Sequence, residues 1–133
     1  MKKLGVALFA LITSLAVVGC GDEQALPDNE RLLAAFANGT TGLWVSGHGT
    51  VVRPLGSPSG TQRFLVRIND ELSLVIRHQV GDLNAVPADR DDVIAFQGRY
   101  EFHGGGGEVI LTHADADNPG GGGWIEFNGT RYQ

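Results

Sequence analysis

Residues 62–78 read QRFLVRINDELSLVIRH, and this stretch decides the fold class of the chain. Within residues 62–68 every second side chain from Phe64 onward is apolar, which is the period of a β-strand with one buried face. Residues 69–71, Asn-Asp-Glu, supply a turn, and residues 72–78 form a second apolar segment of strand length. The stretch therefore predicts an antiparallel hairpin.

Strand patterns continue on both sides of this hairpin. Residues 44–52 also alternate, and one side of that segment carries only small or apolar residues, namely Val45, Gly47, Gly49 and Val51. Glycines inside a strand indicate a sharp bend or a close approach of two backbones. Further strands are expected over residues 93–102, 108–113, 124–127 and 130–133, with loops at residues 54–60, 79–92, 104–107 and 114–123. Asn128 and Gly129 suit a type I′ turn between the last two strands.

One short helix is predicted ahead of the strands, over residues 27–38. Asp28 stands where a helix cap is favoured, an apolar stripe follows it, and Gly39 suits the end of the helix. A helix followed by five or six short strands predicts a mainly β protein, a small Greek-key barrel of the oligonucleotide/oligosaccharide-binding (OB) type. Closure into a barrel would remove exposed sheet edges. A flattened sandwich of the same strands is the alternative.

The N-terminus has the plan of an export signal. Lys2 and Lys3 precede an apolar run over residues 4–18. The run ends in Val17-Val18-Gly19-Cys20, which resembles the lipobox of bacterial lipoproteins, where cleavage occurs before a lipid-modified cysteine. A plain signal peptide with an incidental cysteine and an uncleaved anchor helix are the alternatives, although the apolar run is short for a helix that spans a membrane.

The lipobox-like sequence divides the chain into three parts. We expect a signal peptide at residues 1–19, a lipidated tether at residues 20–29 and a single OB-like domain at residues 30–133. The membrane is then a partner through the lipid on Cys20. Because Gly21 and not aspartate follows the cysteine, the chain lacks the best-known signal for retention in the inner membrane. The periplasmic side of the outer membrane is therefore the expected location.

Charge and cysteine content exclude some classes of protein. Cys20 is the only cysteine, so the exported chain forms no internal disulfide and depends on its core for stability. The formal net charge is −5, and it becomes −7 when Lys2 and Lys3 leave with the signal peptide. A chain of this sign has little of the phosphate attraction that drives nonspecific nucleic-acid binding, so bulk DNA or RNA is not an expected partner.

Several different short motifs follow one another along the chain. They are Trp44-Val45-x-Gly47-x-Gly49-x-Val51, Gln62-Arg63-Phe64, His78, Gly98-x-Tyr100-Glu101, Thr112-His113-x-Asp115, Gly123-Trp124-Ile125 and the terminal Tyr132-Gln133. In this order and spacing they resemble the bacterial family called domain of unknown function 3465, which consists of small exported proteins without an established activity. The resemblance covers the chain from about Leu32 to its end.

Three departures from the family pattern bear on any shared site. Thr61 stands where members tend to have a histidine, and residues 81–87 replace an Asp-Leu-Ala-Pro-Arg run. Ile110 and Leu111 stand where a His-Trp pair usually precedes the Thr-His motif. If these positions form a site in the family, this chain carries an incomplete version of it.

Four residues are the candidates for catalysis, namely His78, His113, Asp115 and Arg63. Imidazole and carboxylate groups bind divalent metals and transfer protons near neutral pH, and a guanidinium holds an anion. None of them lies in a recognised short-range ligand spacing, so no metal site or cofactor is assigned and a divalent metal stays an alternative. The structural interpretation is that His78 and His113 lie at strand ends and bind loop backbone, while His48 and His103 are surface residues.

Four residues are the candidates for ligand binding, namely Arg63, Tyr100, Glu101 and Trp124. Arg63 is expected to pair with Glu101 or Asp115, as an anion clamp or, more simply, as a structural ion pair. Aromatic rings on a barrel face stack sugars or bases, and they equally fill a core. Of the five aromatic residues considered, most are expected in the core; they are Trp44, Tyr100, Phe102, Trp124 and Tyr132.

The first hypothesis is a noncatalytic, lipid-anchored module that binds a small molecule, a glycan or an envelope protein. The alternative is a metal-dependent hydrolase of the nuclease or phosphodiesterase type, and a third option is a structural envelope protein without a ligand. Convergence of the four catalytic candidates in one cleft would favour the hydrolase, and their dispersal would exclude it.

Overall fold

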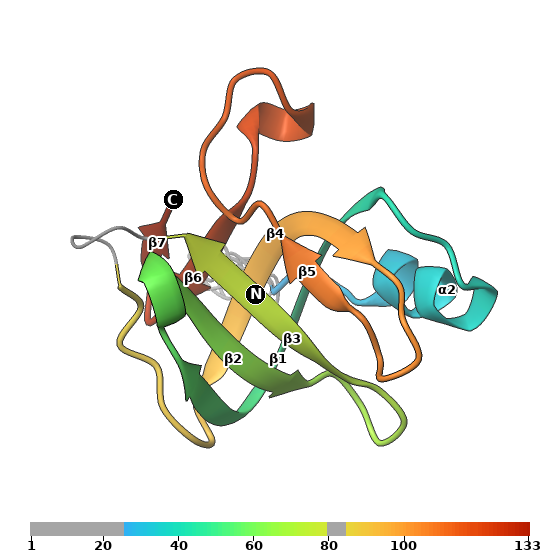
Figure 1. The fold of residues 1–133 in the computed structure, drawn as a ribbon, viewed down its shortest axis with the longest axis horizontal. Coiled ribbons are helices and arrows are strands. Elements are labelled where there is room, and N and C mark those ends of the chain that lie inside the picture. The colour runs from blue at the N-terminus through green and yellow to red at the C-terminus, as the bar shows by residue number, and fades with distance from the viewer. Residues whose placement is uncertain (1–25, 80–84) are drawn as a thin grey trace, which may run out of the picture.

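Figure 1 shows the computed structural model, which describes residues 26–79 and 85–133. In chain order its elements are α2 (Glu30–Asn38), β1 (Leu43–Gly56), η1 (Pro58–Gly60), β2 (Thr61–Arg67), β3 (Ser73–Gln79), β4 (Val93–Glu101), β5 (Glu108–Ile110), η2 (Pro119–Gly121), β6 (Trp124–Phe127) and β7 (Thr130–Tyr132), where η marks a short 3₁₀ helix. The predicted signal peptide and Cys20 lie outside the described residues, and so does most of the predicted tether.

The hairpin predicted at residues 62–78 is formed by β2 and β3. The two strands pair antiparallel in unbroken register, from Thr61 opposite Gln79 to Arg67 opposite Ser73. The Asn69 side chain makes the turn, because its Oδ1 accepts hydrogen bonds from the backbone N–H groups of Glu71 and Leu72.

The sheet closes on itself through β1. The N-terminal half of β1 pairs with β4 and its C-terminal half pairs with β2, both antiparallel. β3 runs parallel to β5, and β5 pairs antiparallel with β4. The order β1-β2-β3-β5-β4-β1 is a closed five-stranded barrel, which confirms the predicted fold class. The flattened sandwich is wrong because β1 is paired along both of its edges. The β6–β7 hairpin extends the sheet beyond β4.

The barrel interior follows the alternation of the strands. Val45, Gly47, Gly49 and Val51 of β1 are buried, as predicted, while the residues between them are partly exposed. The largest fully buried side chains are Tyr100, Phe64, Phe96, Leu32, Leu72, Leu74, Ile76, Ile94 and Ile125. Leu32 comes from α2, so the apolar stripe of that helix packs on the barrel core.

Two glycines mark places where backbones touch. A Cβ added to Gly49 would lie 2.6 Å from the Arg67 carbonyl oxygen, and one added to Gly98 would lie 2.4 Å from the Ile110 carbonyl oxygen. Real Cβ atoms do not approach a backbone oxygen this closely. The close approach that glycine in a strand predicts is confirmed at both positions.

Several element bounds differ from the prediction. α2 begins at Glu30 and not at residue 27, and it ends at Gly39 in the left-handed conformation expected there. β1 continues through Pro54, placed in the loop by the sequence, because register shifts on either side of that residue accommodate a proline without an N–H donor. β5 stops at Ile110 and not at residue 113, because Leu111 adopts a φ of +58°.

The last turn is as predicted. Asn128 and Gly129 have φ angles of +51° and +80°, as a type I′ turn requires.

No helix within residues 26–79 and 85–133 has the length and apolar character needed to span a membrane.

Candidate functional site

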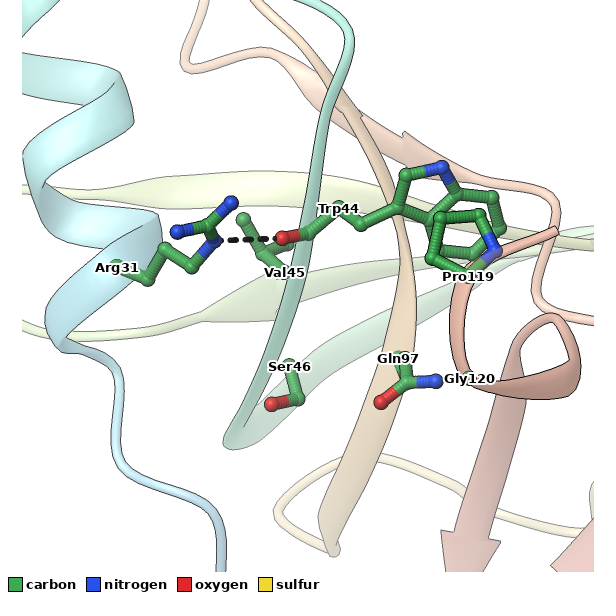
Figure 2. Close-up of a pocket in the computed structure, with 7 residues that line it drawn as sticks. All are labelled: Arg31, Trp44, Val45, Ser46, Gln97, Pro119 and Gly120. Atoms are coloured by element: carbon green, nitrogen blue, oxygen red, sulfur yellow. Dashed lines mark hydrogen bonds between the residues drawn. The ribbon is translucent and has the colours of Figure 1, made fainter.

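A pocket of about 180 Å³ opens on the outer surface of the barrel, where α2, β1, β4 and the loop that carries η2 meet. Figure 2 shows the seven residues that line it, which are Arg31, Trp44, Val45, Ser46, Gln97, Pro119 and Gly120. The pocket is thus built by segments from both ends of the described chain. Figure 1 shows that the loop with η2 projects away from the strands.

The floor of the pocket comes from paired strands. Because Val45 faces the core, its neighbours Trp44 and Ser46 face outward. Ser46 lies opposite Gln97 in the β1–β4 register, so the hydroxyl and the amide are neighbours on the outer face. Gln97 Nε2 donates a hydrogen bond of 2.8 Å to the Gly122 carbonyl, which fixes the amide. Its Oε1 has no hydrogen-bond partner among the described residues and lies on the side of Ser46 in Figure 2.

Arg31 forms the side of the pocket next to α2. Its Nε donates a hydrogen bond of 2.8 Å to the carbonyl oxygen of Trp44, as the dashed line in Figure 2 shows. This bond fixes the guanidinium next to β1 and leaves the terminal nitrogens free to donate to a ligand.

The side of the pocket opposite Arg31 is the loop that carries η2, and hydrogen bonds between backbone groups of this segment fix its conformation. A bridge joins Ala114 to Gly122, and the Gly123 N–H donates to the His113 carbonyl at 2.7 Å. Asp115 organises the loop interior, because its carboxylate accepts hydrogen bonds from the Asp117 N–H and from the Asn118 side chain. The loop therefore presents Pro119 to the pocket in a defined position, where it lines the pocket together with Trp44.

Trp124 lies beside the pocket and not in its lining. It is paired with Gln97 in the β4–β6 register, so it occupies the next strand of the same outer surface. The Arg131 guanidinium lies over its ring, with Cζ 4.1 Å from the ring centroid, and also binds Glu126 at 3.1 Å. One face of the Trp124 indole is therefore already covered by a cation.

A family profile described as "Protein of unknown function (DUF3465)" matches residues 14–133. The chain belongs to this family. The match confirms the resemblance seen in the motifs, and the DUF3465 region includes every residue of the pocket. Searches of curated proteins and of solved structures find no match to the chain.

In this DUF3465 protein the predicted ligand residues are dispersed. Tyr100 is fully buried and its hydroxyl donates a hydrogen bond of 2.7 Å to the Gly106 carbonyl. Burial also raises the pKa of the Tyr100 phenol above its ordinary value. Glu101 pairs with Arg99 at 2.7 Å and accepts a hydrogen bond from Thr41. Tyr100 is thus a core residue, and Glu101 is committed to an ion pair.

The prediction that Arg63 pairs with Glu101 or Asp115 is wrong. Glu101 pairs with Arg99, and Asp115 binds groups of its own loop. Arg63 instead lies opposite Arg77 on the outer surface of β2 and β3.

The catalytic candidates do not share a cleft. His78 is fully buried inside the barrel, where its Nδ1 lies 2.7 Å from the Thr112 hydroxyl. Thr112 donates its own proton to the Arg77 carbonyl, so the His78 contact requires a proton on Nδ1. His78 is the next-to-last residue of β3, so its predicted place at a strand end is confirmed, and the partner of its Nδ1 is the Thr112 side chain. His113 lies in the loop after β5, and Arg63 lies on the outer surface.

Within the described ranges, no three histidine, cysteine, aspartate or glutamate side chains are grouped to hold a metal ion. Asp82, a further acidic residue of the sequence, lies outside those ranges. The geometry therefore gives no support to the metal-dependent hydrolase.

His48 also has a different role from the one predicted. Its Nδ1 binds the Pro27 carbonyl at 2.7 Å, and its backbone N–H donates to the Asn29 side chain at 2.8 Å. These bonds attach the segment before α2 to the barrel. His103 is exposed, as expected.

The prediction that most aromatic side chains fill the core is wrong. Tyr100 is fully buried and Tyr132 packs partly on the core, whereas Phe102 is exposed and both tryptophans lie partly exposed on the outer surface. The sequence placed Trp44 on the side of its strand opposite Val45 without assigning that side to the solvent, and Arg31, Gln97 and Pro119 carried no signal of their own. The pairing of β1 with β4 brings Gln97 close to Trp44, whereas Arg31 reaches it from α2 and Pro119 from the loop with η2.

Proposed function

We propose that this protein is a noncatalytic binding module that holds one ring of a glycan in the Trp44 pocket. The observation that carries the proposal is the position of Trp44, which lies outside the core next to hydrogen-bonding side chains. An indole offers an apolar face to the C–H groups of a sugar ring. The Gln97 amide, the Ser46 hydroxyl and the Arg31 guanidinium are suited to the hydroxyl groups at the edge of such a ring.

The size of the pocket suits contact with one sugar unit and not with a whole oligosaccharide. Sites for drug-sized ligands enclose roughly 300–1,000 Å³, whereas this pocket encloses about 180 Å³ and is open to solvent. A single sugar unit, with the rest of the glycan extending over the surface, fits this volume. Because the loop with η2 is fixed by backbone bonds, binding requires little ordering of the protein.

The chemistry of the lining supports binding and not turnover. Among the described residues that line the pocket there is no histidine, cysteine, aspartate or glutamate. Acid–base catalysis needs such a group within hydrogen-bond reach of the substrate, and the Ser46 hydroxyl has no such base among the described lining residues to activate it as a nucleophile. Arg31 supplies the charge of the lining, and a guanidinium does not exchange protons near neutral pH.

A titration with uncharged oligosaccharides tests this proposal. Isothermal titration calorimetry would use N-acetylglucosamine oligomers and gluco-oligosaccharides as probes, with the protein unchanged and as Trp44→Ala and Trp124→Phe. We expect saturable binding that falls at least tenfold in Trp44→Ala and persists in Trp124→Phe. Absence of binding to every oligosaccharide, or equal loss in both variants, would exclude the Trp44 pocket as a glycan site.

We also propose that the module is exported and anchored by a lipid on Cys20, on the periplasmic side of the cell envelope. The lipobox-like sequence before Cys20 supports this location, and a glycan ligand is consistent with it. Metabolic labelling with a fatty-acid analogue tests it: label should enter the wild-type protein and be lost in Cys20→Ser. Equal labelling of both would refute the anchor.

A further inference from the structure

A second surface of the barrel concentrates positive charge. Residues 21–133 contain eight arginines and no lysine. Four of the eight lie on β1, β2 and β3, with side chains outside the barrel; they are Arg53, Arg63, Arg67 and Arg77. Because the exported chain has a net charge of −7, this local excess of cations is opposite in sign to the protein as a whole.

Two of these arginines face each other directly. Arg63 and Arg77 are register partners in the β2–β3 pair, so they project side by side from the same surface. Like charges placed opposite each other across two antiparallel strands destabilise the sheet. Glu108 offsets the charge of Arg77 from a distance of 3.5 Å.

No carboxylate in residues 26–79 or 85–133 compensates Arg63 in this way. None of the ion pairs among the described residues includes it, and its Nε is buried without a hydrogen-bond partner there. A buried donor that is left unsatisfied lowers the stability of the folded state. An anionic ligand at the terminal nitrogens of the Arg63 guanidinium would supply the missing negative charge.

A hollow of about 150 Å³ lies next to the arginine pair. It is lined by Thr61, Arg77, Gln79, Ile110 and Leu111. Thr61 lies opposite Gln79 in the register, two residues along the strands from Arg63 and Arg77. A hydroxyl, an amide and the Arg77 guanidinium therefore line the hollow together with the two aliphatic residues, and Arg63 lies next to Arg77 outside the lining.

We propose that this hollow binds the phosphate group of a small, soluble phosphorylated molecule. Guanidinium groups match the geometry of a tetrahedral oxyanion, because each offers two parallel N–H donors to two oxygens. The hydroxyl of Thr61 and the amide of Gln79 complete the donors. The aliphatic side formed by Ile110 and Leu111 suits the carbon skeleton of such a molecule.

The same features disfavour larger anionic partners. An extended polyanion would meet the overall negative charge of the protein beyond the arginine pair. A lipid surface would need a broad cationic face, whereas Arg67 is already paired with Asp70 and Arg77 with Glu108. The hollow is confined to one end of the β2–β3 pair.

Binding of inorganic phosphate and of glycerol 3-phosphate to the full chain tests the proposal. Calorimetry should show saturable binding that falls at least tenfold in Arg63→Gln and weakens as salt rises. Arg63→Lys, which keeps the charge but loses the paired donors, should weaken binding by a smaller factor. Arg90→Gln makes the same change of charge in an exposed loop and should bind like the wild type. Circular dichroism establishes that each variant is folded.

Several outcomes would overturn the proposal. One is absence of binding to both phosphate compounds at millimolar concentration in the folded wild-type protein. Another is Arg63-dependent binding to vesicles of phosphatidylglycerol or to single-stranded DNA without binding to free phosphate, which would make the surface a membrane or nucleic-acid site. Trp44→Ala should leave phosphate binding unchanged, so failure of the glycan proposal would be distinguishable from failure of this one.

Discussion

Replacement of Gly98 by alanine tests how the barrel closes. Gly98 lies in β4 opposite Val45 of β1, and the end of β5 together with Thr112 lies over it. An added Cβ would lie 2.4 Å from the Ile110 carbonyl oxygen, 2.8 Å from Val109 Cγ1 and 3.1 Å from Thr112 Cγ2. The first obstacle is a backbone atom, so rotation of a side chain cannot relieve the contact.

The expected cost follows from these distances. Inserting a methyl group into a packed core costs about 1–3 kcal/mol, and a backbone obstacle places Gly98→Ala near the upper end. Alanine recovers about 0.4–1 kcal/mol by restricting the unfolded chain. The net loss of unfolding free energy is about 2 kcal/mol, which lowers the melting temperature of a domain of this size by roughly 10 °C.

Thermal unfolding followed by circular dichroism measures this difference. Gly104→Ala is the matched control, because a Cβ added at Gly104 would meet nothing within 4 Å beyond its chain neighbours, and the φ of Gly104 is not in the left-handed region. We expect this control to melt within a few degrees of the wild type. If Gly98→Ala melted together with Gly104→Ala, the close approach of β4 to the end of β5 would be refuted.

Two further predictions concern the buried polar groups. Burial raises the pKa of Tyr100 above its ordinary value of 10.0, so the folded state favours the neutral phenol. The contribution of this group to the unfolding free energy is therefore complete below pH 10 and is lost as the pH rises through the folded-state pKa. Urea unfolding at alkaline pH should show this decline in the wild type, and Tyr100→Phe should remove it while losing about 1 kcal/mol at neutral pH with the bond to Gly106. Thr112→Val removes the hydroxyl that links His78 to the Arg77 carbonyl, and it should lower the unfolding free energy by about 1–3 kcal/mol. An unchanged urea midpoint in Thr112→Val would contradict the role given to that hydroxyl.

Local periodicity was enough to predict most of the fold. The hairpin of β2 and β3, the phase of β1 and the turn at Asn128 and Gly129 each follow from side chains that are close in sequence. The end of β5 did not follow, because it depends on the left-handed conformation of Leu111, which a leucine rarely adopts.

The site was less accessible to sequence reasoning than the fold. Pocket formation requires Arg31, Trp44, Gln97 and Pro119 to meet, and these residues are separated by up to most of the described chain. Within its own segment, none of these residues has a sequence feature that marks it as part of a site. Arg63 was singled out from the sequence, but its charge partner depends on which strands pair, and the register places it beside Arg77 instead of a carboxylate.

The indole N–H signals of the two tryptophans provide the most direct test of the proposed glycan site. The chain contains only Trp44 and Trp124, so a ¹H–¹⁵N spectrum has two such signals, which Trp44→Phe and Trp124→Phe assign. On titration with an uncharged oligosaccharide that binds in calorimetry, we predict a saturable shift of the Trp44 signal that is larger than that of Trp124, whose ring is covered by Arg131. A bound oligosaccharide that leaves the Trp44 signal in place would contradict the account.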